Sequence, residues 1–360
     1  TGQLVSHSQQ WHTTEIYDVE PPGQPRNFTG HSLASVGGKP ALLVISQQYG
    51  GDSMYFNYVS AVDSAGSSWN PAISVMTLNA SQSSPSLAEI NGAPAFCWRD
   101  DFTVGGLRYI RALEEDGSVW DQPVTVDTTM DPGLISRLLE FNDMPAAIFI
   151  DGGLAVSICM AEDSAGASWQ PRVSVYSGAS RLAASVIPGG IGVVVNDDVT
   201  GELVYKYLKI EGLGVSVKDD VKLFPESVDT NVFVHFGMSG GKPYAISLRG
   251  NQKALYNIFA HDGEGLGWTN PAEISLSGPV VQGAAATAYG VPWVCYIDQG
   301  TDEFRCAHAE AAQSNSWVNE EVVLESFVNH AIPVMGQAGV HPCVVYLNTS
   351  NNIVYFSAYY

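Results

Sequence analysis

Basic side chains are scarce in this sequence: 16 Lys and Arg stand against 37 Asp and Glu, and the formal net charge is −21. A surface of that sign repels the phosphates of nucleic acids, so no nucleic-acid partner is expected. Long apolar runs are missing too, because no stretch approaches the roughly 20 residues that a membrane helix needs, so no membrane insertion is expected. Acidity with so few basic residues favours an extracellular or cell-surface setting.

Helical periodicity is almost absent, whereas strand-like alternation is frequent. Leu203–Tyr207 and Met54–Tyr58 alternate with period two and are rich in aromatic residues, which predicts strands. The sequence also lacks zinc-ligand spacings, a phosphate-binding loop, a nucleophile elbow and a dinucleotide fingerprint, so no metal site or catalytic residue is identified by motif.

Cysteine is sparse and odd in number, with five residues, so at least one thiol is unpaired within the chain. Cys97, Cys159 and Cys343 lie in apolar runs and are expected to be small buried hydrophobes. Cys295 and Cys306 flank a polar turn almost symmetrically, and a cross-strand disulfide between them, which would support export, is left open.

One sequence motif, called the phrase below, recurs along the chain. Asp63-Ser-Ala-Gly66-Ser-Ser-Trp69 returns almost letter for letter as Asp163-Ser-Ala-Gly166-Ala-Ser-Trp169. Weaker copies keep the spacing of acid, glycine and bulky residue: Glu114/Gly117/Trp120, Glu211/Gly214/Val217 and Asp262/Gly265/Trp268. We interpret this phrase as a structural hairpin, in which the acid binds backbone N–H groups, glycine adopts a positive φ and tryptophan packs against the next repeat.

Turns of the type Gly-x-Pro recur about every 50 residues, with four strand-like runs per repeat, as expected for propeller blades. Seven such turns and seven positions in the tryptophan register predict an all-β, seven-bladed β-propeller of four-stranded antiparallel blades, one domain over residues 1–360. The chain ends on a third strand, so the N-terminal strand at Trp11–Val19 is expected to complete the last blade and close the ring.

The phrase resembles the Asp-box hairpin of sialidases, Ser-x-Asp-x-Gly-x-x-Trp, with one extra residue between acid and glycine. It is more similar to bacterial secreted or surface repeat proteins with units near Leu-x-Tyr-x-x-Ala-x-Asp-x-x-Gly-x-x-Trp-x-x-Pro-Val-x-Val, as in Leu107–Val126. The sialidase resemblance implies a glycosidase with three arginines around a carboxylate. No Arg-Ile-Pro segment is present near the N-terminus, so the chain is distant from sialidases.

In the relatives that this resemblance implies, the ligand face lies opposite the phrase hairpins. We expect that face to carry the turns between strands two and three and the first residues of the inner strands, which differ from blade to blade, whereas the phrase repeats. Trp98 beside Arg99 is a candidate sugar-stacking platform, with packing between blades as the alternative. The candidate ligand-binding residues are Trp98, Arg99, Asp100, Asp101, Asp151, Arg137, Arg181, Asp298, His31 and His330, and His235 and Gln282 begin inner strands in the same way.

The sequence predicts a non-catalytic extracellular propeller, monomeric, that binds a carbohydrate or a protein on this face. Two alternatives stay open: an extracellular polysaccharide hydrolase or lyase using acids of the rim, and an architectural module of a larger surface protein. No cofactor is expected. Carboxylates around the rim leave Ca²⁺ as an alternative, and ordinary solvated turn residues are the simpler explanation for them.

Overall fold

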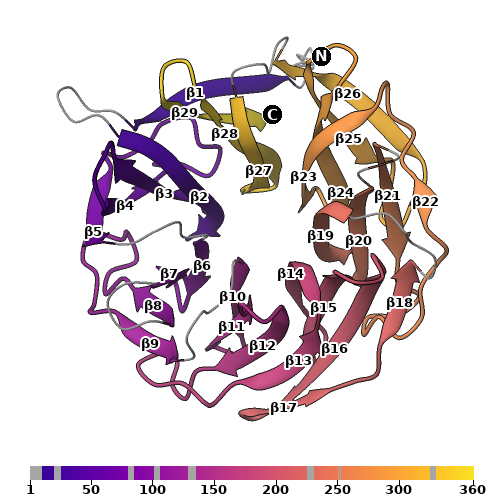
Figure 1. Cartoon of the computed structure of the whole chain (residues 1–360). Helices are drawn as coiled ribbons and strands as arrows, with labels where there is room; N and C mark the ends of the chain where they lie inside the picture. Colours follow the sequence, from indigo (N-terminus) through magenta and orange to yellow (C-terminus); the bar gives the residue numbers. More distant parts are fainter. Residues whose placement is uncertain are drawn as a thin grey trace, which may run out of the picture.

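The computed structural model describes residues 10–19, 26–79, 85–100, 106–128, 135–224, 231–249, 251, 253–324 and 330–360, with the side chains at 79, 231–232, 319–321 and 330–332 outside the description. These residues form seven antiparallel sheets arranged as blades around a central channel (Figure 1). The structure therefore confirms the predicted seven-bladed β-propeller. No helix of the described residues has the length and hydropathy needed to cross a membrane.

Each blade is a meander whose first strand lines the channel and whose fourth lies at the periphery. Blades 1 to 3 contain β2 (Arg26–Val36), β3 (Lys39–Gln48), β4 (Ser53–Ser60) and β5 (Ile73–Asn79); β6 (Ser86–Ile90), β7 (Ala93–Arg99), β8 (Leu107–Arg111) and β9 (Val124–Asp127); and β10 (Ile135–Phe141), β11 (Met144–Ile150), β12 (Ala155–Met160) and β13 (Val173–Ser177). Blades 5 and 6 contain β19 (Asn231–Ser239), β20 (Lys242–Arg249), β21 (Ala254–Phe259) and β22 (Ala272–Glu273); and β23 (Val280–Ala288), β24 (Val291–Asp298), β25 (Phe304–Ala309) and β26 (Trp317–Leu324).

Blades 4 and 7 depart from this plan. Blade 4 contains β14 (Ala179–Ile187), β15 (Gly190–Asp197) and β16 (Leu203–Glu211), and its outer strand is split into β17 (Gly214–Val217) and β18 (Val221–Phe224), both paired with β16. Blade 7 contains β27 (His330–Ala338), β28 (His341–Asn348) and β29 (Ile353–Tyr359), completed by the N-terminal β1 (Trp11–Asp18). The pairing of Trp11 with Tyr359 confirms the predicted ring closure.

The acid–Gly–Trp hairpins, which are the phrase copies at 63–69, 114–120, 163–169 and 262–268, join strands three and four of blades 1, 2, 3 and 5. In blade 1, Asp63 Oδ1 accepts hydrogen bonds from the backbone N–H groups of Ala65 (3.0 Å) and Ser67 (3.1 Å), and the Trp69 indole N–H donates to Gly66 O at 3.0 Å. The Asp163, Gly166 and Trp169 hairpin and the Asp262, Gly265 and Trp268 hairpin repeat these contacts. In blade 2 the carboxylate that binds the turn is Asp116, two residues after Glu114.

These hairpins also join neighbouring blades. The glycine of each lies against an aromatic ring on strand three of the preceding blade: Gly66 on Phe356, Gly117 on Tyr58, Gly166 on Tyr109 and Gly265 on Tyr205. Gly117 has φ +73°, and a Cβ there would lie 2.5 Å from the Tyr58 ring, so no larger residue fits without displacement. The repeated phrase therefore closes the seams between blades.

The cysteines follow the sequence analysis. Cys295 and Cys306 pair across β24 and β25 and form a disulfide with a Cα–Cα distance of 4.1 Å. Cys97, Cys159 and Cys343 are free and buried. Burial raises the pKa of the Cys97 thiol to about 11, so this cysteine remains protonated and inert at neutral pH.

Candidate functional site: the rim and the central cavity

Acids at the rim bind their own turns. In blades 2, 3, 4 and 6 an aspartate stands at or just after the end of strand two: Asp100, Asp151, Asp197 and Asp298. Asp151 Oδ1 accepts hydrogen bonds from the N–H groups of Gly153 (2.9 Å) and Ala155 (3.0 Å). Asp298 Oδ1 accepts one from Gly300 N–H at 2.8 Å. These rim acids thus share a second repeated structural role, in which the carboxylate stabilises its own turn. Asp100 and Asp298 are buried rather than solvated.

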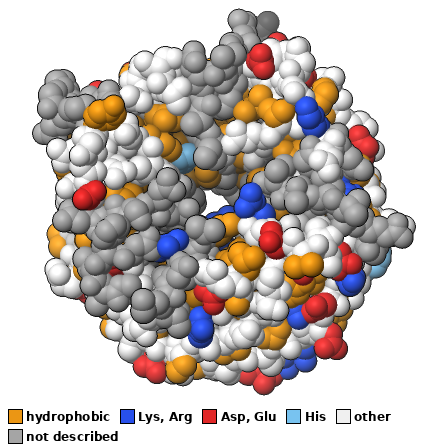
Figure 2. All heavy atoms as spheres, viewed as in Figure 1, with side chains coloured by type: hydrophobic (Ala, Val, Ile, Leu, Met, Phe, Trp, Pro, Cys, Tyr) orange, Lys and Arg blue, Asp and Glu red, His pale blue; other side chains and the backbone are white. Residues whose placement is uncertain are grey.

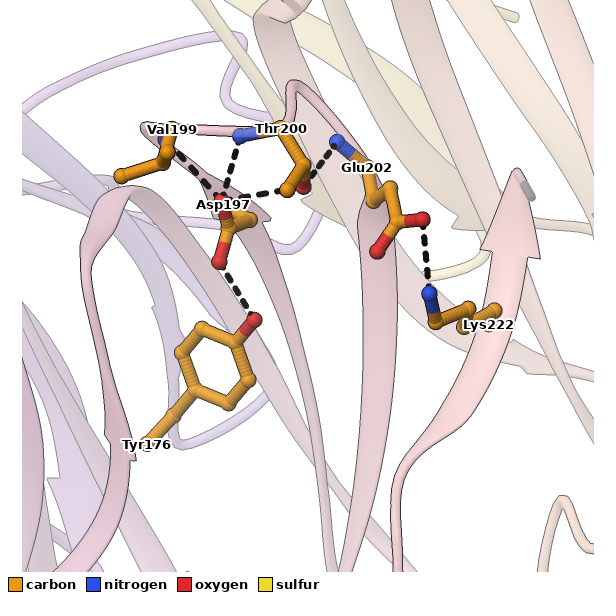
Figure 3. A network of polar contacts seen from close by, with 6 residues as sticks. All are labelled: Tyr176, Asp197, Val199, Thr200, Glu202 and Lys222. Atoms are coloured by element: carbon orange, nitrogen blue, oxygen red, sulfur yellow. Dashed lines mark hydrogen bonds and ion pairs between the residues drawn. The ribbon is translucent and has the colours of Figure 1, made fainter. Parts of the chain in front are cut away.

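The Asp197 carboxylate shows how many hydrogen bonds such an acid can accept (Figure 3). Its Oδ1 accepts hydrogen bonds from Val199 N–H (2.9 Å), Thr200 N–H (2.7 Å) and the Thr200 hydroxyl (2.9 Å), and its Oδ2 accepts one from the Tyr176 hydroxyl at 2.6 Å. Burial alone would raise the pKa of Asp197, but these hydrogen bonds to the charged form outweigh it and lower the pKa. A carboxylate with four donors has little capacity left for a ligand.

Trp98 requires a correction. Its side chain is only 1% exposed and packs in the seam between blades 1 and 2, with ring centroids 5.9 Å from Phe56 and 5.4 Å from Phe96. The expectation of an exposed stacking platform is therefore wrong, because the flat ring is used between blades. Arg99, next along β7, is half-buried.

Around the described part of the rim no three His, Cys, Asp or Glu side chains converge in a way that would hold a metal ion. Asp101 lies outside the described residues, as does the side chain of His330. Arg181 is exposed and its guanidinium donates to Ser180 O at 3.0 Å. The described rim candidates are thus dispersed, whereas His31 and Arg137, with His235, line one cavity.

The central cavity has a volume of about 620 Å³ and is lined by all seven inner strands. Among the described residues, three lining side chains carry basic groups, namely His31 on β2, Arg137 on β10 and His235 on β19, and none is Asp or Glu. Figure 2 shows Lys and Arg side chains at the edge of the central opening. In a chain with 37 acids and a net charge of −21, this is a marked separation of charge.

Arg137 takes a position that has a structural role in two other blades. Ser32 Oγ accepts a hydrogen bond from Leu87 N–H, and Ser86 Oγ accepts one from Leu138 N–H, both at 2.9 Å, so that these serines join adjacent inner strands. Ser32, Ser86 and Arg137 lie at the same distance from the last residue of their inner strands. Arg137 is therefore the residue of blade 3 that corresponds to the two serines. Because a guanidinium cannot accept a hydrogen bond, Arg137 cannot make the contact with the next inner strand that the serines make.

The guanidinium of Arg137 has no ion-pair partner within the described part of the chain, and its recorded hydrogen bond is a donation to Ser136 O at 2.9 Å. Burial lowers its pKa, but an arginine remains charged. Although Arg137 is only half-buried, a cation withdrawn from water without a carboxylate is costly unless something supplies an anion or water. A negatively charged group in the cavity would offset this cost.

His235 is held in one tautomer by a chain of hydrogen bonds. Thr287 Oγ1 donates to Met238 O at 3.0 Å, so it accepts from the Tyr244 hydroxyl at 3.0 Å, and that hydroxyl accepts from His235 Nε2 at 3.1 Å. His235 therefore carries its proton on Nε2 and presents a lone pair on Nδ1. Burial, with the charge of Arg137 adding to it, lowers the pKa of His235 to about 4.

His31 is the third basic group of the cavity. Its Nε2 is shielded from solvent and has no hydrogen-bond partner among the described residues, and its ring lies 5.2 Å from that of Phe28. Burial lowers the pKa of His31 to about 4. Both histidines are therefore neutral at pH 7, where they offer hydrogen bonds rather than charge.

Sequence reasoning found His31, Arg137 and His235 because they break the repeat. It missed Tyr244 and Thr287, which fix the tautomer of His235, since nothing in their local sequence distinguishes them from ordinary strand residues.

No family model matches the sequence, and no curated protein matches it. Solved structures do resemble it. The periplasmic gluconolactonase PpgL of Pseudomonas aeruginosa aligns with a TM-score of 0.58 at 12% identity, covering 82% of this chain and 85% of that one. A PL25 ulvan lyase bound to -[GlcA(1-4)Rha3S]- aligns with a TM-score of 0.57 at 12% identity, covering 95% and 92%. The NanB sialidase of Streptococcus pneumoniae aligns with a TM-score of 0.55 at 10% identity, covering 96% and 70%. At such identities the likeness shows the propeller fold alone.

Proposed function

We propose that this protein is an extracellular, non-catalytic propeller that binds an acidic carbohydrate at its central cavity. Arg137 would hold a carboxylate or sulfate of the ligand, and the neutral His31 and His235 would exchange hydrogen bonds with its hydroxyl groups. The observation that carries the proposal is a half-buried arginine, without an ion-pair partner in the described part of the chain, in a cavity whose described lining has no Asp or Glu, within a strongly acidic chain.

The chemistry of the cavity supports binding more than catalysis. A histidine with a pKa of about 4 is a weak general base at neutral pH, and both cavity histidines have that property. A hydrolase using the rim acids would need two carboxylates aimed at one bond. Asp151 and Asp298 instead accept hydrogen bonds from their own turns.

Two further features are consistent with this function. A disulfide between Cys295 and Cys306 suits an oxidising compartment, which supports an extracellular or cell-surface location. One of the structural neighbours was solved with -[GlcA(1-4)Rha3S]-, whose units carry a carboxylate and a sulfate. The resemblance to secreted bacterial repeat proteins points the same way.

The test is a glycan array containing uronate-bearing, sialylated, sulfated and neutral glycans, followed by titration calorimetry of the hits. The wild-type protein should bind acidic glycans with an affinity that falls as salt is added, because the contact is an ion pair. Arg137→Gln should weaken binding at least tenfold. Arg181→Gln removes an exposed arginine of the next inner strand, outside the cavity, and should leave binding unchanged.

Absence of acidic hits, or equal binding by wild type and a folded Arg137→Gln variant, would overturn the proposal. Depolymerisation of any bound glycan by the wild-type protein would overturn its non-catalytic part and return the polysaccharide lyase or hydrolase alternative.

A further inference from the structure

The seam between blades 6 and 7 differs from those that the acid–Gly–Trp hairpins cover. Blade 7 takes its third strand from the C-terminus and its fourth from the N-terminus, so no hairpin joins them. Gln10 and Tyr360 instead pair through two backbone hydrogen bonds of 3.2 and 3.3 Å. On this seam the described residues surround a cavity of about 320 Å³, lined by Tyr289, Val291, Trp293, His308, Ala309, Glu310 and Tyr359.

Three aromatic rings form the walls of this seam cavity. The Trp293 ring centroid lies 5.5 Å from that of Tyr359 and 6.2 Å from that of Tyr289, with interplanar angles of 52° and 50°. His308 stacks on Trp293 at 4.6 Å and so supports it from one side. Glu310 is exposed at the edge of the cavity.

Tyr289 occupies a strained position. Its φ is +51°, a left-handed conformation that bulky residues rarely adopt. The same turn position holds Gly37, Asn91, Asn142, Gly240 and Gly339 in other blades, all with positive φ and all residue types that tolerate it. The tyrosine is held there by hydrogen bonds between its hydroxyl and His341 Nδ1 and Tyr359 O. Strain retained at a cavity wall, where glycine or asparagine would fit, points to a role for the ring.

Trp293 and Glu310 decide the class of ligand. The indole Nε1 of Trp293 is shielded from solvent and has no acceptor in the described part of the chain, so a ligand that reaches it would have to offer an acceptor. A quaternary ammonium ion would suit aromatic walls but has no acceptor to offer. A carboxylate would be repelled by Glu310. A sugar hydroxyl both accepts from an indole N–H and donates to a carboxylate, and the apolar face of a pyranose packs on aromatic rings.

We propose that the seam cavity binds one unit of a neutral saccharide. The ligand lies against Tyr289 and Tyr359, accepts a hydrogen bond from Trp293 Nε1 and donates one to Glu310. The volume, about 320 Å³, is at the lower end for ligand pockets and suits a single sugar unit. The site lies on other blades than Arg137 and is independent of the central cavity.

The probes are methyl glycosides of neutral hexoses, deoxyhexoses and N-acetylhexosamines, with methyl glucuronide and tetramethylammonium chloride as competitors from other classes. Binding is measured by saturation-transfer NMR and by calorimetry. At least one neutral glycoside should bind the wild-type protein. Trp293→Phe keeps an aromatic ring but removes the N–H and part of the indole surface, and Glu310→Gln keeps the shape and removes the charge, so each should weaken binding by about tenfold or more.

Two matched controls separate the site from the rest of the molecule. Trp317→Phe removes another shielded indole N–H of blade 6, which has no acceptor among the described residues and does not line the cavity. Glu264→Gln removes an exposed acid of the blade 5 hairpin. Neither should change binding. Arg137→Gln should also leave it unchanged, which distinguishes this site from the proposed acidic-glycan site.

The inference is overturned if no neutral glycoside binds, if tetramethylammonium binds in preference, if methyl glucuronide binds the Arg137→Gln variant in preference, or if both site variants bind like the wild type. Should Trp293→Phe fail to fold, the exposed Glu310→Gln variant decides the matter alone.

Discussion

The outer hairpins and the inner strands of this propeller use their residues in opposite ways. At the hairpins the same acid, glycine and tryptophan recur, and each set binds its own turn and the preceding blade. On the inner strands the equivalent positions change from Ser32 and Ser86 to Arg137 and His235. Repetition thus marks the contacts that hold the ring together, and its loss marks the cavity where a ligand can be held.

The largest effect is expected at the hairpins. Gly117→Ala forces a Cβ into the Tyr58 ring at a φ of +73° and should lower the free energy of unfolding by about 3 kcal/mol. Gly212→Ala has a similar φ of +60° with no atom near its Cβ, and should cost only about 1 kcal/mol. Urea unfolding of both variants measures the difference. Equal losses would show that the contact with Tyr58 is unimportant.

A smaller effect is expected from the cavity histidines when the pH falls. Both are held neutral in the folded protein by a pKa of about 4, whereas the unfolded chain titrates near 6.5. The unfolded state therefore takes up protons first, and stability should decline by on the order of 2 kcal/mol for the pair between pH 6.5 and pH 5.5, and continue to fall toward pH 4. Calorimetric unfolding at several pH values measures the decline, and the double variant His31→Asn, His235→Asn should flatten it. A slope that is unchanged in the variant would contradict this account.

Restoring the repeat at the third inner strand should trade function for stability. Arg137→Ser removes a half-buried charge and supplies a hydroxyl where Ser86 has one, with Ala184 N–H as the equivalent donor. We expect the free energy of unfolding to rise by about 1.5 kcal/mol while acidic-glycan binding is lost. Chemical denaturation and calorimetry measure the two changes. A less stable Arg137→Ser variant would show that the arginine itself supports the fold.

The smallest effect is expected from removing one serine bridge between blades. Ser86→Ala leaves Leu138 N–H without its acceptor and should cost about 1 kcal/mol. Ser185→Ala, on an inner strand, loses only a contact of 3.4 Å to Val186 O and should change stability by less than half of that. Thermal unfolding distinguishes the two. Glycan binding by Ser86→Ala should remain, because Arg137 is untouched.

The sequence by itself determined the architecture. The phrase spacing gave the blade count, and the unpaired strands at the two ends gave the closure at Trp11 and Tyr359. These features are local patterns repeated along the chain, and a repeated local pattern has few ways to fold. The breaks in the repeat also pointed to His31 and Arg137.

The tertiary structure decided whether a residue that departs from the repeat packs in a seam or lines a cavity. Trp98 and Arg137 are both departures from the repeat, yet the first is buried in a seam and the second lines the cavity. The seam cavity around Trp293 exists because the two chain ends, rather than a hairpin, complete blade 7. Burial and partnership depend on residues far apart in sequence that only the closed ring brings together.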